Sequence, residues 1–371
     1  MTGSSPFTAA STATLRVLLL SRYGRKGASS RMRHEQFLPR LAAGGVAVTT
    51  APFFSDAYLD ALYAGRRWPL PKVAGCYARR AAALLSACRH DLLWIEKETL
   101  PWLPFAAERA LLALAPRYVV DFDDAWFHHY DQHRHPLIRR LLGAKLDRLM
   151  RGAALVTVGN GYLAERAERA GARKVEILPT VVDLSRYSTM PSPERPGPLR
   201  VGWIGSPTTA RYLDQLAEPL ARLIAEGVIR LVLIGGGEQA LPGLDAERVS
   251  WSEDGEVAVL NSLDAGIMPL RDSMWERGKC GYKLIQYMAC AKPTIASPIG
   301  VNTDIVEDGV TGLLADHSAD WEVAMRRLAA APDLRRRMGE AGRAKVERSY
   351  SLHGVAPRLI ELLRSAAGDA V

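Results

Sequence analysis

The chain has 371 residues, of which 48% are hydrophobic and 24% charged. This length and composition suit two globular domains and exclude a disordered chain, a collagen-like repeat and a small disulfide-stapled scaffold. The four cysteines form no C-x-x-C pair, so we predict reduced thiols and no metal centre. No apolar run reaches the roughly 18 residues of a membrane-spanning helix, and no secretion signal is recognisable, so we expect a cytoplasmic protein.

The positive charge is unevenly distributed. Residues 1–185 hold 26 Lys and Arg against 16 Asp and Glu, whereas the remaining residues hold 22 against 24. A basic first half could meet an anionic membrane surface, an acidic substrate or nucleic acid. Simple solubility is the alternative, and the charge alone does not decide between them.

The first half alternates short apolar runs with helix-like stretches, after a tail at 1–14. This alternation favours parallel strands joined by crossover helices, because parallel neighbours cannot be joined by a tight hairpin. We predict one domain at 15–187, with strands at 15–21, 46–51, 92–95, 118–122, 154–158 and 175–178 and helices at 31–43, 77–88 and 136–150.

A Pro-rich stretch at 188–198 predicts a linker, after which the alternation restarts. We predict a second domain at 199–352, and a last helix within 353–371 that crosses back to the first domain. The fold class is therefore α/β, with two Rossmann-like, doubly wound parallel sheets. The expected strands are at 200–204, 230–234, 249–251, 265–268 and 294–296, and the expected helices at 209–225, 281–290, 318–330, 332–350 and 354–366.

The most informative segment is 275–300, which contains a Gly-rich loop followed by a helix. Gly278 and Gly281 let backbone amides approach a ligand, and the start of the helix adds unpaired N–H groups. Lys279 and Lys283 supply positive charge, with Arg277 nearby. Together these features suit a diphosphate, although such loops are common and lysines are usually solvated.

The order of short motifs around this loop is typical of one family. Residues 284–297 read L-I-Q-Y-M-A-C-A-K-P-T-I-A-S, and Ile305–Gly309 and Thr311–Leu314 follow at characteristic spacing. Upstream lie P-T-V-V-D at 179–183 and L-R-V-G-W-I-G-S at 199–206. This pattern resembles the retaining GT-B glycosyltransferases of glycosyltransferase family four, the group 1 glycosyl transferases. The resemblance covers about residues 155–350, and the first domain matches mainly in pattern.

The resemblance implies a GT-B fold with two domains facing across a cleft. It also implies sugar transfer from a nucleoside diphosphate sugar to a hydroxyl acceptor, with retained anomeric configuration and with no metal or separate cofactor. In the implied mechanism the leaving diphosphate helps to remove the acceptor's proton, so no protein nucleophile is required. The donor would bind Gly205, Ser206, Thr208, Trp251, Gly278, Lys279, Cys280, Gly281, Tyr282, Lys283 and Gln286.

Two departures from the family pattern affect the donor site. The family has two glutamates eight positions apart, and here Gln286 aligns with the second and Gly278 with the first. Gln286 can still hydrogen-bond ribose hydroxyls, and Glu276 is a possible substitute for the missing carboxylate. The Arg and Lys that often follow the first strand of the second domain are replaced by S-P-T-T at 206–209.

The acceptor side is expected at the carboxyl ends of first-domain strands. Candidate acceptor-binding residues are Gly27, Ser29, Arg31, Glu96 and Asp121, and the expected catalytic residues are Asp123, Asp124, Lys279 and Glu276. Clustered carboxylates can orient hydroxyls or accept a proton. A basic surface turn at 23–31 and a helix N-cap at 121–124 are the alternatives.

Two further stretches carry weaker signals. His128, His129, His133 and His135 match no standard metal spacing and predict a polar loop. Residues 66–72 predict a loop that could contact an anionic membrane surface. A non-catalytic nucleotide-sugar-binding subunit and a sugar-nucleotide epimerase or hydrolase remain alternatives to a transferase, whereas nucleic-acid binding is disfavoured because no nucleic-acid module is recognisable.

Overall fold

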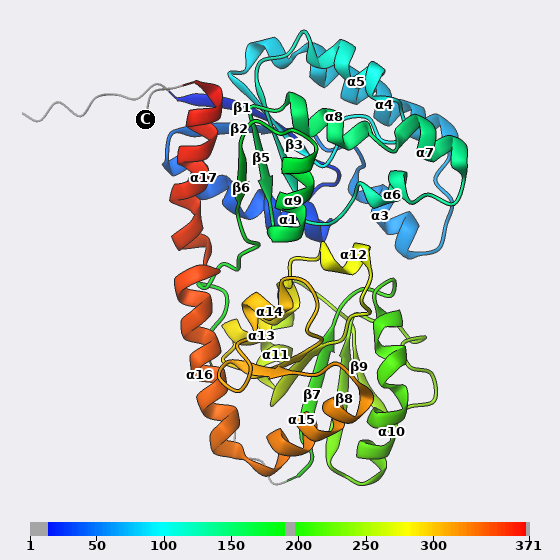
Figure 1. The fold of residues 1–371 in the computed structure, drawn as a ribbon, viewed down its shortest axis with the longest axis vertical. Coiled ribbons are helices and arrows are strands. Elements are labelled where there is room, and N and C mark those ends of the chain that lie inside the picture. Colours follow the sequence, from blue (N-terminus) through cyan, green and yellow to red (C-terminus); the bar gives the residue numbers. More distant parts are fainter. Residues whose placement is uncertain (1–13, 190–196, 369–371) are drawn as a thin grey trace, which may run out of the picture. The chain divides into compact units, whose positions relative to one another are not determined.

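The structure is a computed structural model that describes residues 14–189 and 197–368. Most of the predicted tail at 1–14 and of the predicted linker at 188–198 lies outside these residues. The strands form two six-stranded parallel sheets with helices packed on them (Figure 1). This confirms the predicted pair of doubly wound α/β sheets.

The first sheet has the strand order β2-β1-β3-β4-β5-β6. The order reverses between β1 and β3, so the loops that follow these two strands diverge and leave room for a ligand at the carboxyl edge. The strands are β1 (Leu15–Leu20), β2 (Val46–Thr50), β3 (Leu92–Glu96), β4 (Tyr118–Phe122), β5 (Leu155–Val158) and β6 (Val175–Ile177).

The second sheet has the order β12-β11-β10-β7-β8-β9, which is the strand order of a dinucleotide-binding Rossmann domain. Its order reverses between β7 and β10. The strands are β7 (Leu199–Ile204), β8 (Ile229–Ile234), β9 (Ala246–Val249), β10 (Ala265–Met268), β11 (Thr294–Ala296) and β12 (Gly312–Leu314).

Helices connect nearly all of these strands. Those around the first sheet are α1 (Ala28–Arg33), η1 (Glu35–Phe37), α2 (Leu38–Ala43), α3 (Asp56–Tyr63), α4 (Leu70–Leu85), η2 (Ala87–Arg89), α5 (Phe105–Leu112), α6 (His128–Asp131), α7 (Pro136–Leu142), α8 (Lys145–Gly152) and α9 (Gly161–Arg169). Those around the second are η3 (Ala210–Leu216), α10 (Ala217–Ala225), α11 (Glu256–Asn261), α12 (Met274–Arg277), α13 (Tyr282–Ala289), α14 (Asn302–Ile305), α15 (Ser318–Ala330) and α16 (Pro332–Ser349), followed by α17 (Leu352–Ala367).

The chain divides into two compact units whose border runs through the first sheet. One unit comprises residues 1–120, 153–155 and 356–371, and the other comprises 121–152 and 156–355. The loops that follow β4 and β5 therefore belong to the same unit as the whole second sheet. Within the first unit, α17 packs on the start of β2, where Arg364 Nη2 donates to Gly44 O at 3.1 Å.

Alternation along β7 builds the core on both faces of the second sheet. Val201 and Trp203 pack with side chains of α10 and α15, whereas Ile204 packs with those of α13. Gly202 faces the α13 side, where an added Cβ would lie 2.1 Å from Leu263 Cδ1. Burial of each large side chain stabilises the fold by about 1.5–3 kcal/mol, which fixes the strand ends that carry the loops described below.

Several predicted element bounds are wrong. The helix predicted at 31–43 is broken at His34, whose backbone leaves helical angles while its ring packs on Trp94. The helix predicted at 136–150 is split into α7 and α8 near Gly143, where a Cβ would meet Arg139 O at 2.3 Å. The first half of the helix predicted at 209–225 is the 3₁₀ helix η3.

Three stretches predicted as strand or loop differ as well. The strand predicted at 249–251 ends at Val249. The loop predicted at 66–72 already contains the first turn of α4. Pro71 is tolerated there because backbone N–H groups in the first turn of a helix have no intrahelical acceptor, so none is lost. His128 and His129 form part of α6 rather than a loop.

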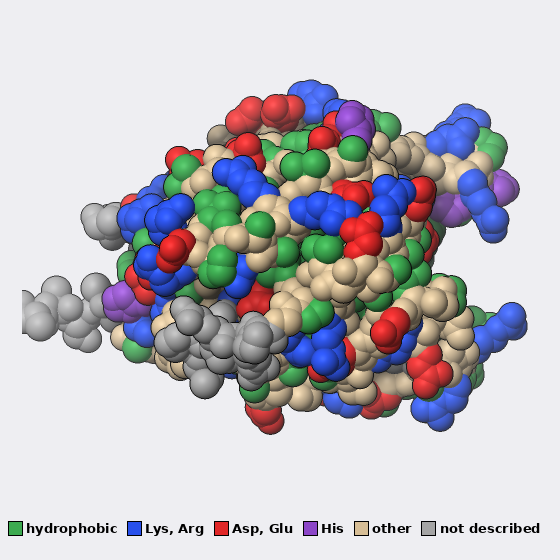
Figure 2. All heavy atoms as spheres, turned by 90° about the horizontal axis from the view of Figure 1, so that it is seen from below, with side chains coloured by type: hydrophobic (Ala, Val, Ile, Leu, Met, Phe, Trp, Pro, Cys, Tyr) green, Lys and Arg blue, Asp and Glu red, His purple; other side chains and the backbone are tan. Residues whose placement is uncertain are grey.

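Surface charges of both signs lie among one another on the face drawn in Figure 2. Such interspersion is typical of a solvated surface. Among the described residues, no helix has the length and apolar character needed to span a membrane.

Candidate functional site

The turn after β7 faces a lysine from α13. Gly205 follows β7, and a Cβ added to it would lie 2.7 Å from Lys283 Nζ. The Lys283 ammonium lies over the Trp203 ring, 4.2 Å from its centroid, and forms no hydrogen bond or ion pair with any described residue. Burial and, to a smaller extent, the charge of Lys279 together lower the pKa of Lys283 to about 7. Among the residues that the structure describes, the lysine at the carboxyl end of β7 thus has no anionic partner.

Hydroxyl groups line the same turn. Ser206 Oγ and Thr208 Oγ1 are 2.8 Å apart, and the Ser206 amide donates to Thr209 Oγ1 at 3.1 Å. Ser206 is half-buried and Thr208 is exposed, so both hydroxyls can turn toward a ligand. Hydroxyls and a nearby ammonium are suitable partners for phosphate oxygens.

The loop after β10 is fixed by the loops that follow β4 and β5. Asn160 Nδ2 donates to Lys279 O at 2.9 Å, and Cys280 Sγ donates to Asp123 O at 2.9 Å. Lys279 Nζ lies 3.9 Å from Asp124 Oδ1. The structure therefore brings together Asp123, Asp124, Lys279 and Cys280, four of the predicted site residues.

Close packing explains why residue 278 is a glycine. A Cβ at this position would lie 2.5 Å from Ala125 Cβ and 2.7 Å from Ala125 N. Any side chain would have to displace this segment, so the carboxylate expected at this position has no room here. Gly281 is equally constrained, because its φ is +63° and a Cβ would meet Ile305 Cδ1 at 2.3 Å.

Glu276 is an ionised, buried carboxylate with both oxygens occupied. Tyr212 Oη donates to Oε1 at 2.6 Å, and Ser273 Oγ donates to Oε2. Burial opposes ionisation of Glu276, but these two hydrogen bonds, its own backbone amide and the charge of Lys279 hold its pKa below the ordinary value. Tyr212 also lies beneath Lys279 Nζ, 5.8 Å from the ring centroid, so Glu276 helps to hold the Lys279 loop.

Gln286 belongs to a chain of buried hydrogen bonds that reaches Trp251. Its Nε2 donates to Tyr187 Oη at 3.1 Å, and Tyr187 Oη donates to Glu256 Oε1 at 3.0 Å. Trp251 Nε1 donates to Glu256 Oε2 at 2.8 Å, while the Trp251 side chain is 39% exposed. Burial raises the pKa of Tyr187 well above its ordinary value, as do Tyr282 and Glu256. Two predicted nucleotide-binding residues are thus linked through two residues that were not predicted.

Comparison with known families and proteins can now be added to this geometry. Residues 198–331 match the family described as glycosyl transferases group 1. This part of the chain is a group 1 glycosyl transferase domain. The domain contains the turn after β7, the Lys279 loop and α13, and the match ends within α15.

Two curated relatives match over shorter stretches. The chain is 35% identical over 91 residues to an alpha-maltose-1-phosphate synthase of Mycolicibacterium smegmatis, which covers 22% of this chain and 24% of the relative. It is 26% identical over 147 residues to an N-acetyl-alpha-D-glucosaminyl L-malate synthase of Bacillus anthracis, which covers 38% of each. The chain thus matches about a quarter to two fifths of the length of these relatives.

A solved structure is similar over nearly the whole chain. Anabaena HepE, crystallised with UDP and glucose, superposes with a TM-score of 0.71 at 16% identity, over 95% of this chain and 100% of that one. This likeness establishes the fold. The first sheet lies outside the group 1 domain and the second lies inside it, and together the two sheets form a GT-B fold.

The predicted acceptor-side residues other than Asp121 belong to the first unit. Glu96 Oε2 accepts from Ser30 Oγ at 2.6 Å and from the Arg22 amide at 2.8 Å, and Lys97 Nζ donates to Ser29 Oγ at 3.0 Å. Gly27 lies before α1, where a Cβ would meet Tyr23 Cβ at 2.4 Å.

Two remaining acceptor-side residues have structural partners. Arg31 Nη1 donates to the carbonyl oxygen of Arg25 at 3.1 Å. Asp121, in the second unit, is buried and accepts a hydrogen bond from Thr157 Oγ1 at 2.6 Å. Among the described residues, no group of three or more His, Cys, Asp or Glu is arranged to hold a metal ion.

Sequence reasoning missed Asn160, Trp203, Tyr212 and Tyr187. Asn160 had a usable signal, because G-N-G directly follows the strand β5 at the edge where ligands bind. Trp203 had a weaker one, as a large ring near the end of β7, two residues before Gly205. Tyr187 and Tyr212 had none, since their hydroxyls meet Gln286 and Glu276 only through the tertiary fold.

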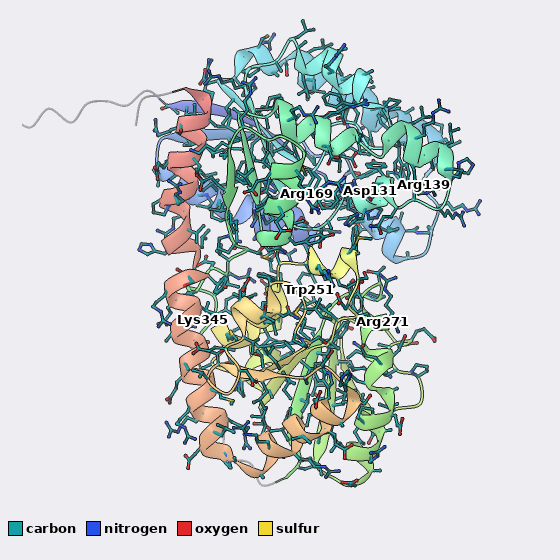
Figure 3. The ribbon with its side chains drawn as sticks, viewed as in Figure 1. Asp131, Arg139, Arg169, Trp251, Arg271 and Lys345 are labelled. Atoms are coloured by element: carbon teal, nitrogen blue, oxygen red, sulfur yellow. The ribbon has the colours of Figure 1, made fainter. Side chains whose placement is uncertain are left out.

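Arg271 and Trp251, labelled in Figure 3, come from the loops after β10 and β9.

Proposed function

We propose that this chain is a retaining glycosyltransferase that moves a sugar from a nucleoside diphosphate sugar to a hydroxyl acceptor. The observation that carries this proposal is the Lys283 ammonium, which faces Gly205 at the carboxyl end of β7 without an anionic partner among the described residues. A diphosphate supplies the missing negative charge. Because residues 198–331 match the glycosyl transferases group 1 family, we infer that this diphosphate belongs to a sugar nucleotide.

The surroundings of Lys283 are suited to a leaving diphosphate. Backbone amides at the start of α13 and the Ser206 and Thr208 hydroxyls add hydrogen-bond donors. Charge that develops during transfer is best stabilised by such fixed donors and cations. We propose that Lys279 and Lys283 carry this charge, so that the reaction runs without a metal ion.

The other residues of the donor half have complementary proposed roles. We propose that Gln286 and Trp251, which are linked through Tyr187 and Glu256, position the nucleoside. Asp123 and Asp124 would orient sugar hydroxyls beside Lys279. Since both oxygens of Glu276 accept internal hydrogen bonds, we propose that it supports the Lys279 loop.

The acceptor is proposed to bind through Gly27, Ser29, Arg31, Glu96 and Asp121, and to be a glycan, a lipid-linked glycan or a metabolite hydroxyl. A cytoplasmic role in polysaccharide synthesis, at the inner membrane surface, fits the stretch that leads into α4. There Leu70 is 82% exposed and follows Arg66 and Arg67. A basic segment with an exposed apolar side chain is attracted to anionic lipid.

The test is calorimetry with UDP, GDP and ADP, on the wild-type protein and on a variant with Lys279→Ala and Lys283→Ala. We expect one nucleotide to bind at micromolar concentration and the double variant to lose that binding. If the wild type binds none of the three, the donor site is absent and the proposal fails.

Product analysis then separates a transferase from its alternatives. Incubation of the matching sugar nucleotides with candidate acceptors should give a glycoside of unchanged anomeric configuration. Free sugar or an altered sugar nucleotide would instead indicate a hydrolase or epimerase. Binding without turnover would favour a non-catalytic subunit, a function that the glycine at position 278 also suits.

A further inference from the structure

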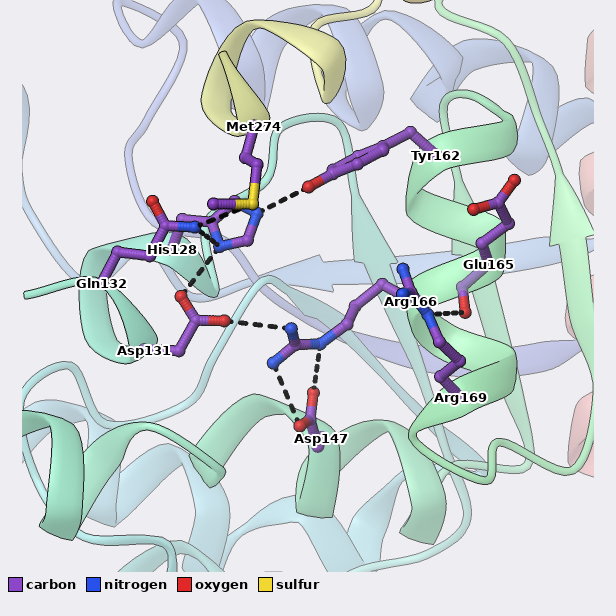
Figure 4. Close-up of polar contacts among 9 residues, drawn as sticks. All are labelled: His128, Asp131, Gln132, Asp147, Tyr162, Glu165, Arg166, Arg169 and Met274. Atoms are coloured by element: carbon purple, nitrogen blue, oxygen red, sulfur yellow. Dashed lines mark hydrogen bonds and ion pairs between the residues drawn. The ribbon is translucent and has the colours of Figure 1, made fainter.

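A tyrosine, a histidine and an aspartate form a hydrogen-bonded chain close to Met274 of α12 (Figure 4). His128, in α6, is buried, and its Nε2 lies 2.8 Å from Tyr162 Oη in α9. Its Nδ1 lies 2.8 Å from Asp131 Oδ1 and 3.0 Å from the side-chain Nε2 of Gln132. No role proposed above uses these residues.

The carboxylate determines the direction of the hydrogen bonds in this chain. Asp131 Oδ2 pairs with Arg166, and its Oδ1 faces His128 Nδ1, so the hydrogen bond between them is best satisfied when Nδ1 carries the imidazole proton. With the ring proton on Nδ1, Nε2 offers a lone pair and accepts a hydrogen bond from the Tyr162 hydroxyl. The phenolic oxygen of Tyr162 then keeps lone pairs that can accept a hydrogen bond from a ligand hydroxyl.

Asp131 is itself held in place. Its Oδ2 pairs with Arg166 Nη1 at 3.0 Å, and Arg166 forms two hydrogen bonds with Asp147, at 2.8 and 3.1 Å. Burial opposes the charge of Arg166, but the two aspartates raise its pKa, so the guanidinium remains charged. This support keeps the imidazole of His128 in one orientation.

The chain lies beside the donor half of the site. Asn160, two residues before Tyr162, donates to Lys279 O at 2.9 Å. Gln132, next to Asp131, reaches Met274 Sδ in α12 at 3.4 Å, and the ring of His129 lies 4.6 Å from that of Trp275. Tyr162 is half-buried, so part of the residue remains exposed to solvent.

We propose that Tyr162 contacts the donor sugar, with its phenolic oxygen accepting a hydrogen bond from a sugar hydroxyl. His128 and Asp131 are positioning residues that act through Tyr162. The inference rests on the proposed function, since it requires a sugar nucleotide on the Lys279 loop. Its consequence is selective: Tyr162 contributes to binding of the sugar and not to binding of the nucleotide.

The test compares the affinity for a nucleoside diphosphate with that for its glucose conjugate. UDP and UDP-glucose are the first probes, and GDP and GDP-glucose or ADP and ADP-glucose replace them if calorimetry identifies another base. For Tyr162→Phe we expect nucleotide affinity within twofold of wild type and sugar-nucleotide affinity about five- to tenfold lower, as for the loss of one hydrogen bond. His128→Gln should shift the same ratio in the same direction.

Tyr350→Phe is the matched control, because it removes the hydroxyl of another half-buried tyrosine at the end of α16. It should leave both affinities unchanged. The inference is overturned if Tyr162→Phe leaves both affinities at their wild-type values. It is also overturned if both affinities fall by the same factor, which would indicate a structural role. Failure of the proposed function looks different, because the wild type would then bind no nucleotide.

Discussion

The two sheets end in loops at equivalent places, but the charged side chains in these loops are paired differently. After β1 and β3, Arg22 pairs with Glu98 at 3.4 Å and its amide with Glu96, so opposite charges meet within the first unit. At the edge after β7 and β10, the Lys283 ammonium of α13 contacts the Trp203 ring and pairs with no carboxylate among the described residues. Equivalent topology therefore supplies a balanced edge in one sheet and, among the described residues, an edge with an unpaired lysine in the other.

This difference has a physical cost that indicates a ligand. A partly buried ammonium without an anion is unfavourable, as the lowered pKa of Lys283 shows. The cation–π contact with Trp203 offsets only part of that cost. A bound diphosphate would remove it, whereas the balanced edge suits an uncharged polyol such as a sugar acceptor.

Replacement of Lys283 by methionine should have the largest effect on the comparison. The variant keeps the apolar stem on Trp203 but removes the charge, and a charge-assisted hydrogen bond contributes about 1.5–3 kcal/mol. We therefore expect nucleotide affinity to fall about 10- to 150-fold in calorimetry. The melting temperature of the free protein should stay the same or rise, because an unpaired charge is lost.

Lys345→Met is the control for net charge. Lys345, labelled in Figure 3, lies on α16 and donates to the carbonyl oxygen of Asp304. Its replacement removes one positive charge outside the turn after β7, and nucleotide affinity should change less than twofold. Equal losses in the two variants would mean that overall charge, and not the edge at β7, attracts the nucleotide.

Filling the space at Gly205 should have a somewhat smaller effect. In Gly205→Ala, the new methyl group would lie 2.6 Å from Trp203 ring atoms and 2.7 Å from Lys283 Nζ. Both side chains must move, which we expect to cost about 1–3 kcal/mol of stability and to weaken nucleotide binding about tenfold. Thermal unfolding and calorimetry measure the two effects.

Gly75→Ala serves as the control for this prediction. Gly75 lies in α4, where an added Cβ meets only Arg79 Nη1 at an ordinary 3.6 Å. Neither binding nor stability should fall. Normal nucleotide binding in Gly205→Ala would place the diphosphate away from this turn and would break the contrast between the two edges.

Most of the fold could be predicted from the sequence, because apolar runs and helical stretches alternate regularly along the chain. Short apolar runs separated by helical stretches identify β1, β3, β7 and β10, and their alternation with helices requires parallel sheets. The positions at which helices are interrupted could not be predicted. His34 leaves the helix so that its ring can pack on Trp94, a contact formed only after β3 is in place.

The site was accessible where motifs are local. The Gly-Lys loop and the start of α13 are contiguous in sequence, so their convergence near Lys283 could be anticipated. The reason for Gly278 could not be, because it depends on Ala125, more than 150 residues away. The same holds for Glu276, whose partner Tyr212 follows β7 on a different part of the chain.

The pH dependence of binding should sharpen the comparison further. The pKa of Lys283 is about 7 in the free protein, and a bound diphosphate raises it. From pH 7 to 9 binding therefore takes up a proton, and affinity should fall with rising pH by at most tenfold per unit. Calorimetry in buffers of different ionisation enthalpy counts the protons. Lys283→Met should show neither the proton uptake nor the decline.

Stability of the free protein should change with pH in the opposite sense. The folded-state pKa of Lys283 lies below its unfolded value of about 10.4, so the unfolded state binds the extra proton between these limits. Wild-type stability relative to Lys283→Met should therefore rise as pH increases from about 7 toward 10. A constant difference across this range would show that Lys283 is ordinarily solvated and would remove the contrast.

Glu96→Gln should give the smallest effect on nucleotide binding, because Glu96 belongs to the balanced edge. The carboxylate accepts from Ser30 Oγ and the Arg22 amide, and an amide oxygen can accept the same two bonds less strongly. We expect stability to fall by about 1 kcal/mol and nucleotide affinity to stay within twofold of wild type. Once an acceptor is known, its KM should rise while that of the donor does not. A nucleotide affinity lowered as much as in Lys283→Met would mean that both edges hold the donor's charge, and the division between a donor edge and an acceptor edge would be wrong.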